Sequence, residues 1–181
     1  MPEPFTRLDR EVVVDNPWHR YCHDRYVLAD GSVGDYWYVD MAGSCAVIPW
    51  FEDGSTVLIE VERYLLGRKL WEFPIGGMRP GEQPLPVAQR ELLEEAGMTA
   101  SRWDALGHFA PYKGASNELC HFFVARDLTV GEQRLEASER ITVHRFPFAE
   151  ARRRLVDQEC GDGQSMAGLL LFERWLERQR A

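Results

Sequence analysis

One segment, residues 76–98, constrains the chain more than any other, because a glycine-rich turn leads directly into an acidic helix. Residues 75–82 contain three glycines and a proline, a composition typical of a loop. Apolar residues then recur at helical spacing over residues 85–96, and Gly97 follows where a helix C-cap belongs. We therefore expect a loop and a helix at which the backbone can approach a ligand closely.

Three glutamates of this predicted helix lie close together on its surface. Glu91 and Glu95 are four residues apart and share one face, and Glu94 is three residues from Glu91. Like charges at these spacings repel, and acids near a helix C-terminus oppose the helix dipole. A divalent cation such as Mg²⁺ or Mn²⁺ would offset both effects, because carboxylate oxygens are its natural ligands. On this fragment alone a solvated acidic face is the alternative, and Arg90 could orient the acids by pairing with Glu82.

The composition restricts the partners of the chain. Its 181 residues carry 21 Lys and Arg against 29 Asp and Glu, a formal net charge of −8. This excess argues against nucleic-acid binding by phosphate neutralisation, but it allows a nucleotide-sized anionic substrate held by a few local cations. With 45% hydrophobic and 28% charged residues, the chain is typical of a single globular domain with at most a small appendage.

The sequence indicates neither a membrane nor an oxidising compartment. Residues 1–14 are charged throughout and lack the apolar region of a secretory signal. The longest apolar runs, such as residues 168–172, are too short to span a membrane. The four cysteines form no C-x-x-C pair, so reduced thiols are expected. We therefore expect a cytoplasmic protein.

Two regions with different patterning are predicted. Short β-favouring stretches separated by turn signals indicate a small antiparallel β-sheet in residues 1–42, ahead of a second domain over residues 43–181. In that domain the order of strands, helix, strands and helices indicates an α/β fold with a mixed sheet and helices packed on its faces. The expected strands are residues 11–14, 21–28, 36–41, 44–50, 56–62, 70–73, 103–109, 118–125 and 140–146. The expected helices are residues 85–96, 148–156 and 165–178.

The glycine-rich loop and the acidic helix also match a longer pattern at fixed spacing. The pattern contains Gly76, Glu82, Arg90, Glu91, Leu92, Glu94, Glu95, Gly97 and Met98. It resembles the signature of the Nudix hydrolases, G-x5-E-x7-R-E-U-x-E-E-x-G-U, in which U is apolar. The resemblance implies an α/β/α sandwich that hydrolyses a nucleoside diphosphate linked to another group, with divalent ions bound by the loop and helix.

The resemblance assigns roles by position. Glu91 and Glu95 would be the main metal ligands, and Glu94 a further ligand or supporting group that we count with the catalytic residues. The carbonyl of Ile75 could contribute to the metal site. The supporting residues would be Gly76, Glu82 and Arg90. The expected cofactor is Mg²⁺, with Mn²⁺ as the alternative, and the ions would neutralise the diphosphate and help to ionise the attacking water.

Outside the signature, the chain resembles the ADP-ribose pyrophosphatase branch, which also cleaves other nucleoside diphosphate sugars. The runs N-P-W-H-R-Y, L-A-D-G-S and D-Y-W-Y-V look like the leading sheet of that branch, which in the family pairs two subunits and completes each active site. A homodimer is therefore expected, with residues 1–42 serving in dimerisation and base binding. Trp18 and Trp37 of this sheet could stack on the base, and a position in the dimer core is the alternative for both.

A second resemblance to this branch precedes the signature. Residues 62–64 and 71–74 resemble its Q-Y-R and W-E-x-P-A-G elements, which implies that Arg63 contacts a phosphate or a ribose. Two positions depart from the pattern, since Val61 stands where Gln is usual and Ile75 where Ala is usual.

Further candidates follow the signature. Pro111 lies near the position of the proline that marks members acting on ADP-ribose, and the loop P-Y-K-G-A-S-N-E resembles their P-x-x-G-x-S-x-E element up to Glu118. In several members the general base is a glutamate on the loop before the last strand. Here that loop offers Glu136 and Glu139, and we favour Glu139 because it precedes the strand by the shorter step. A solvated loop carboxylate is the alternative for each.

The sequence therefore predicts a Mg²⁺-dependent pyrophosphohydrolase that converts ADP-ribose, or a related nucleoside diphosphate sugar, to a nucleoside monophosphate and a sugar phosphate. One alternative keeps the reaction and changes the substrate to GDP-mannose or a UDP-sugar, because a few hydrogen bonds decide base preference. Another is a Nudix module that senses a nucleotide without cleaving it, although such proteins usually lose the signature glutamates that are intact here.

Overall fold

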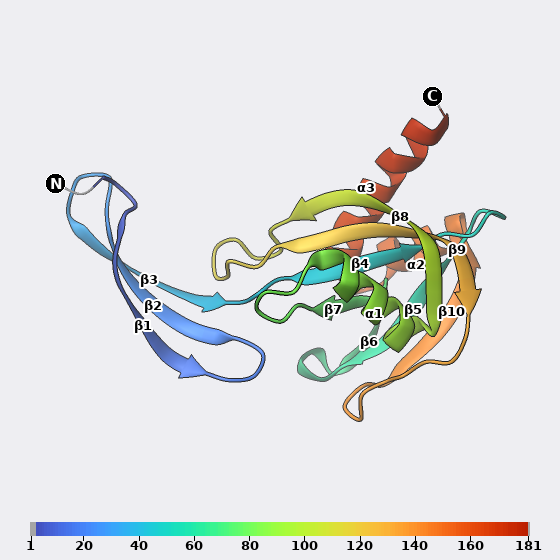
Figure 1. Ribbon diagram of the computed structural model, residues 1–181, viewed down its shortest axis with the longest axis horizontal. Coiled ribbons are helices and arrows are strands. Elements are labelled where there is room, and N and C mark those ends of the chain that lie inside the picture. Colours follow the sequence, from blue (N-terminus) through green and yellow to red (C-terminus); the bar gives the residue numbers. More distant parts are fainter. Residues whose placement is uncertain (1–2, 181) are drawn as a thin grey trace.

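The computed structural model describes residues 3–180, and Figure 1 shows that they form two separate parts. The first is an antiparallel sheet of strands β1 (Arg7–Asp15), β2 (Arg20–Val27) and β3 (Val33–Asp40), paired in that order. This N-terminal sheet projects to the left of the molecule in Figure 1. The small antiparallel sheet expected at the start of the chain is therefore confirmed.

The second part contains two sheets. One has the strand order β7-β4-β9-β8 and the other β10-β5-β6. β4 (Ser44–Pro49) runs parallel to β9 (Cys120–Val130), whereas the other pairs are antiparallel, so the predicted mixed sheet is confirmed. The remaining strands are β5 (Ser55–Arg63), β6 (Arg68–Glu72), β7 (Ile75–Gly77), β8 (Met98–Phe109) and β10 (Ile141–Pro147). The helices are α1 (Pro84–Ala96), α2 (Phe148–Asp157) and α3 (Gly163–Arg180), and a short 3-10 helix spans Tyr64–Leu66.

Helices cover both faces of the four-stranded sheet, because side chains of its central strands alternate between two apolar clusters. Along β4, Ala46 and Ile48 enter the cluster that contains Phe172 of α3 and side chains of α2. Cys45 and Val47 enter the other cluster, which contains the apolar stripe of α1. α1 therefore lies on one face and α2 and α3 on the other, as an α/β/α sandwich requires (Figure 1).

The helix α1 ends where the sequence predicts. Gly97 adopts a φ of 65°, in the left-handed region, and its N–H donates to the Leu93 carbonyl at 3.0 Å. A Cβ built on Gly97 would lie 2.9 Å from the backbone nitrogen of Gln133, so the loop between β9 and β10 packs tightly against this end of α1. The contact brings the loop that carries Glu136 and Glu139 to the acidic helix.

Some elements differ from the sequence-based expectation. The loop expected over residues 75–82 begins as the strand β7, which pairs with β4. Three residues of which two are glycine carry no alternating pattern, so this strand leaves no signal in the sequence. β8 and β9 are longer than expected because residues 98–102 and 126–130 also pair with each other. Among residues 3–180, no helix combines the length and the apolar character needed to span a membrane.

Among residues 3–180, the hydrogen bonds between the N-terminal sheet and the second part go to the loop between β8 and β9. The N–H of Val39 donates to the Ala115 carbonyl at 2.8 Å, and the Tyr36 hydroxyl donates to the Gly114 carbonyl at 3.0 Å. This loop, residues 110–119, includes Glu118. β3 and the candidate substrate-contact loop are therefore joined by direct hydrogen bonds.

Candidate active site

The acids of α1 and the glycine of β7 lie together. Glu91 and Glu95 are each only 6% exposed, and Glu94 is half-buried. A Cβ built on Gly76 would lie 1.8 Å from Cδ of Glu91, so only a glycine fits between β7 and this carboxyl. The loop and helix expected from the sequence thus bring three carboxyl groups to one edge of the sheet.

The backbone of β7 binds the carboxyl of Glu95. The Ile75 N–H donates to Oε2 of Glu95 at 2.7 Å. Burial nonetheless raises the pKa of Glu95 well above its usual range; the hydrogen bond from Ile75 opposes this shift, and the charges of Glu91 and Glu139 add to it. The ionised form of Glu95 is therefore stabilised by any cation that enters the site.

Arg90 forms ion pairs with the glutamates of α1. Its Nη1 lies 2.7 Å from Oε1 of Glu91 and 3.1 Å from Oε2 of Glu94. Its Nη2 donates to the Gly77 carbonyl at 3.2 Å and stands 3.9 Å from Oε2 of Glu82. The sequence suggested Glu82 as the partner of Arg90, whereas the structure places this guanidinium closer to the acids of its own helix.

Glu82 has a different role in the local geometry. Its Oε2 accepts the N–H of Arg79 at 2.7 Å, which closes the turn before α1. This contact fixes the path of the glycine-rich loop as it leaves β7. Glu82 is thus placed to support the loop.

The loop between β9 and β10 brings two further carboxylates to α1. Burial raises the pKa of Glu91 to about 7; Arg90 opposes the shift, and the charges of Glu94, Glu139 and Glu136 add to it. Glu136 and Glu139 are linked to each other, since the Glu136 N–H donates to Oε2 of Glu139 at 2.8 Å. Both candidate general bases therefore lie close enough for their charges to act on Glu91, one of the three signature acids Glu91, Glu94 and Glu95.

The same loop is fixed to the C-terminal end of α1 by hydrogen bonds. The Gly131 N–H donates to the Gly97 carbonyl at 2.7 Å, and the Arg134 N–H donates to the Glu94 carbonyl at 2.9 Å. Because α1 carries the signature acids, these hydrogen bonds fix the position of the loop relative to those acids.

The donor chemistry of the site fits a hard divalent ion. Within residues 3–180, no group of three or more His, Cys, Asp or Glu is arranged to hold an ion as the side chains stand. In this arrangement Arg90 pairs with Glu91 and Glu94, and the Ile75 N–H donates to Glu95. Burial raises the pKa of Glu91 and of Glu95, and a bound cation would favour the ionised form of both carboxyls.

Arg63 stands beside this cluster and is held by a residue that sequence reasoning did not select. Its Nε donates to Oε1 of Glu72 at 2.7 Å, and its Nη2 donates to Oε2 of the same carboxylate. Glu72 is 1% exposed. The available signal was an acid inside the otherwise apolar stretch of residues 70–73, a position at which burial requires a partner.

Glu118 is held by two side chains that the sequence also left unassigned. The Ser44 hydroxyl donates to Oε1 of Glu118 at 2.6 Å, and Nε2 of Gln164 donates to the same oxygen at 3.2 Å. Gln164 belongs to the first turn of α3, so three distant segments meet at this carboxylate. Pro111 lies half-buried at the start of the same loop.

The two candidate base-stacking residues lie on the N-terminal sheet. Trp18 is 79% exposed in the turn between β1 and β2. Trp37 of β3 stacks on His23, with ring centroids 4.0 Å apart, and remains 49% exposed. Because this sheet projects away from α1 (Figure 1), one chain does not bring these indoles to its own acidic cluster.

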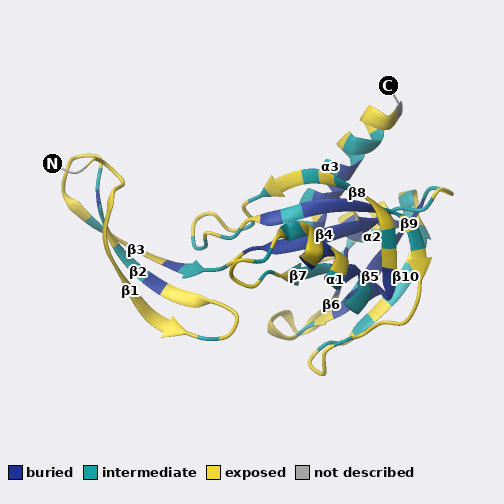
Figure 2. Ribbon diagram, viewed as in Figure 1, coloured by how far each residue is buried: buried dark blue, intermediate teal, exposed yellow. Residues whose placement is uncertain are grey.

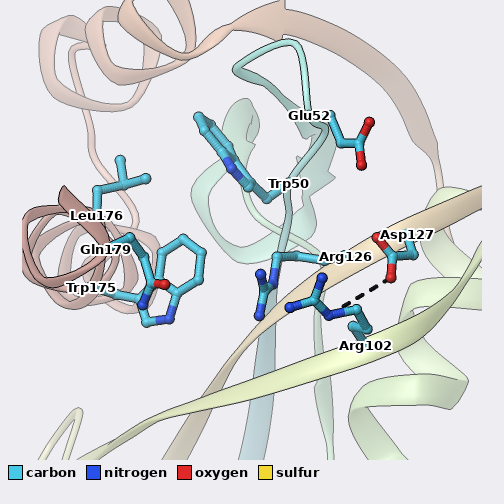
Figure 3. A pocket seen from close by; sticks show the side chains of 8 residues that line it. All are labelled: Trp50, Glu52, Arg102, Arg126, Asp127, Trp175, Leu176 and Gln179. Carbon is cyan, nitrogen blue, oxygen red and sulfur yellow. Dashed lines mark ion pairs between the residues drawn. The ribbon is translucent and has the colours of Figure 1, made fainter.

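A separate hollow of about 250 Å³ lies on the opposite face of the sheet, under the C-terminal part of α3 (Figure 3). Arg126 there pairs with Asp104 at 2.5 Å, and Nε of Arg102 lies 3.8 Å from Asp127, the ion pair drawn in Figure 3. Each of these guanidinium groups has its own carboxylate, and none of the signature acids lines the hollow.

Comparison with known proteins defines the class. The NUDIX domain family model matches residues 43–162, which include β7, α1 and the loop before β10. The chain therefore belongs to the Nudix family and is a Nudix hydrolase. Nudix hydrolases generally use divalent metal ions, in agreement with the donor chemistry of the site.

Individual proteins similar to this chain include two curated relatives and one solved structure. The chain is 31% identical over 150 residues to the ADP-ribose pyrophosphatase of Mycobacterium tuberculosis, covering 81% of this chain and 72% of that relative. It is 29% identical over 140 residues to the ADP-ribose pyrophosphatase of Bacillus subtilis, covering 76% of each protein. A crystal structure of an ADP compounds hydrolase has the same fold, with a TM-score of 0.81 at 22% identity, covering 98% of this chain and 96% of that one.

Proposed function

We propose that this Nudix hydrolase cleaves the diphosphate of ADP-ribose, or of a closely related ADP-sugar, to AMP and a sugar phosphate with Mg²⁺. The observation that carries the proposal is the convergence of buried Glu91 and Glu95 with Glu94 and Glu139 on the edge of β7. The two ADP-ribose pyrophosphatases to which the chain is similar support the substrate class.

In this proposal the glutamates of α1 bind the metal, and a glutamate of the loop between β9 and β10 acts as the general base. Glu91 and Glu95 hold the metal, with Glu94 and the Ile75 carbonyl as further donors. When bound there, divalent ions would neutralise the diphosphate and favour ionisation of the attacking water. Glu139, with Glu136 hydrogen-bonded to it, accepts the proton of that water from the loop that rests on α1.

The substrate contacts come from two segments, the end of β5 and the loop between β8 and β9. Arg63 supplies a cation to the phosphates, Glu118 supplies a carboxylate to a hydroxyl of the sugar, and Pro111 of the same loop contributes to substrate binding. The family resemblance supports these roles, and for Arg63 the charge of Glu95 that acts on its guanidinium supports a place near the acids of α1.

We also propose that the chain is a homodimer in which the N-terminal sheet, residues 1–42, covers a second copy. Every residue of β1 is exposed, and Figure 2 shows this strand in the colour of exposed residues, whereas β2 and β3 alternate exposed residues with half-buried and buried ones. Its exposed apolar side chains include Leu8, Val12, Val13, Val14, Tyr21, Val33, Tyr36 and Trp37. Apolar area of this extent on a projecting sheet is typical of an interface. Trp18 and Trp37 would then meet the base in the partner's site.

Two other functions compete with this proposal. A GDP-mannose or UDP-sugar hydrolase would use the same acids and differ only at the base and sugar contacts. A nucleotide sensor would not need the full set Glu91, Glu94 and Glu95, which this chain retains. The cytoplasmic location expected from the sequence stays a prediction.

The test is a substrate panel with the full-length chain. ADP-ribose, GDP-mannose and UDP-glucose are each incubated with Mg²⁺ or Mn²⁺, and the released nucleoside monophosphate is measured as kcat/KM. We expect the highest value with ADP-ribose and Mg²⁺, and a loss of more than about 100-fold in Glu95→Gln. A higher kcat/KM for another sugar nucleotide would replace the substrate, and tight binding of ADP-ribose without turnover of any compound would favour the sensor.

A further inference from the structure

The ion pair between Arg63 and Glu72 is unusual in its burial and in its position. Glu72 ends β6 at 1% exposure, whereas the side chain of Arg63, at the end of the neighbouring β5, is 43% exposed. The guanidinium uses its Nε and Nη2 edge, with Nε donating at 2.7 Å. The buried carboxylate of Glu72 thus accepts two hydrogen bonds from one edge of the Arg63 guanidinium, and the arginine side chain is partly exposed to solvent.

Stability alone does not account for this pair. Burial raises the pKa of Glu72, and the opposing influence of Arg63 does not cancel that rise. Desolvating a carboxylate costs free energy that a single ion pair rarely recovers, and apolar replacements of such pairs are often neutral or stabilising. The fork-to-fork geometry instead supplies orientation, because two parallel hydrogen bonds fix the plane of the guanidinium.

The orientation matters because of what lies next to Arg63. The charges of Glu95 on α1 and Asp162 before α3 both act on its guanidinium. Its Nη1 donates no hydrogen bond within residues 3–180. The pair therefore presents a free N–H group at the border of the acidic cluster.

We propose that Glu72 is a positioning residue, which fixes the guanidinium of Arg63 so that Nη1 is presented to a diphosphate bound at the acids of α1. The inference rests on the proposed function for the identity of the substrate. It adds a role for Glu72 that acts only through Arg63.

The substitution that isolates this role is Glu72→Gln. Glutamine has the same length and can still accept from Nε, but its amide NH₂ meets the Nη2 donor of Arg63 and loses that hydrogen bond. The matched control is Glu60→Gln, because Glu60 pairs with Lys69 at 2.7 Å across the same two strands but at the surface. Glu60 lies outside the proposed site.

The first experiment is a double-mutant cycle on kcat and KM for ADP-ribose, using Arg63→Ala, Glu72→Gln and the double variant. Glu72→Gln is expected to lower kcat/KM by about 10- to 100-fold, mainly through KM, as for the loss of a hydrogen bond between charged groups. In the Arg63→Ala background it is expected to change kcat/KM by less than about twofold, because its effect requires the arginine. Glu60→Gln is expected to match the wild type.

The second experiment is chemical rescue. Guanidinium at millimolar concentration, far below denaturing levels, should restore activity to Arg63→Ala, since Glu72 still provides the carboxylate that binds it. The double variant should not be rescued. Equal losses from Glu72→Gln with and without Arg63, or rescue of both variants, would overturn the positioning role and leave Glu72 as a purely structural residue.

A third readout does not depend on turnover. Calorimetry with the α,β-methylene analogue of ADP-ribose and Mg²⁺ should give weaker binding to Glu72→Gln than to the wild type, with melting temperatures recorded for both proteins. Weaker binding with an unchanged melting temperature supports positioning, whereas equal binding contradicts it. If the wild type itself neither cleaves ADP-ribose nor binds the analogue, the proposed function fails, and this outcome is distinct from a failed cycle.

Discussion

Replacing Gly76 by alanine tests the geometry of the acidic cluster most directly. Gly76 is not among the glycines with positive φ, so alanine meets no backbone strain at this position. The added Cβ would instead lie 1.8 Å from Cδ of Glu91 and 2.1 Å from its Oε2. The three atoms nearest to the added Cβ all belong to the carboxyl group of Glu91, so the substitution acts first on that group.

The size of the effect follows from the required movement. Ordinary van der Waals contact begins at 3.4 Å, so Cδ of Glu91 must withdraw from 1.8 Å by about 1.6 Å. Misplacing a reacting group by about 1 Å can cost on the order of 100-fold in rate. We therefore expect kcat/KM of Gly76→Ala to fall by about 100-fold or more, and its stability to fall by only about 1–3 kcal/mol.

The neighbouring glycine supplies a matched control. A Cβ built on Gly77 meets nothing within 4 Å, and its φ is not positive either. Both variants are assayed for AMP release from ADP-ribose with Mg²⁺ and for thermal unfolding. We expect Gly77→Ala to retain activity within about threefold of the wild type, as for an ordinary surface substitution. A folded Gly76→Ala protein with wild-type activity would refute the reasoning, because Glu91 could then not stand against β7 during turnover.

Other measurements probe the metal site, the thiols and the interface. Divalent ions should raise the melting temperature of the wild type, because they bind the folded state, and Glu95→Gln should reduce that shift in thermal denaturation. At pH 8 an alkylating reagent should modify half-buried Cys160 before Cys45 and Cys120, because burial raises the pKa of both to about 12 and keeps them protonated; equal rates by peptide mass spectrometry would contradict this. Val13→Asp adds a charge to the exposed β1 and should give a monomer by light scattering at micromolar concentration, with unchanged melting temperature, whereas a persistent dimer would count against this surface as the interface.

The part of the site that the sequence predicts is the part built from local spacing. Glu91, Glu94 and Glu95 fall on one helix, and helical periodicity alone brings them together. Gly97 ends that helix in the left-handed conformation that its position implied. Such features depend on residues within one or two turns, which a single sequence displays completely.

The contacts that join distant segments could not be predicted in this way. Ser44 and Gln164 are 120 positions apart, and their shared hold on Glu118 depends on how α3 packs against β4. Likewise, the ion pair between Glu72 and Arg63 requires the pairing of β5 with β6. Neither partner choice leaves a periodic signal, because each is decided by tertiary packing.

The partner of Arg90 illustrates a second limit. The fixed spacing between Glu82 and Arg90 suggested a pair, but helix geometry places Glu91 and Glu94 nearer to the guanidinium. Spacing identifies which residues belong to a site more readily than it identifies which of them touch.

The hydrogen bonds between β3 and the loop that carries Glu118 have a consequence for how activity depends on concentration. If the N-terminal sheet pairs two chains, contact with the partner would hold β3 more firmly, and the hydrogen bond from Val39 to Ala115 would pass that restraint to the loop of the same chain. The loop would then move more in a separated chain than in the dimer, although each chain remains folded. Specific activity would fall on dilution before any unfolding is detectable, so that the amount of this protein in the cell would itself set how active each molecule is.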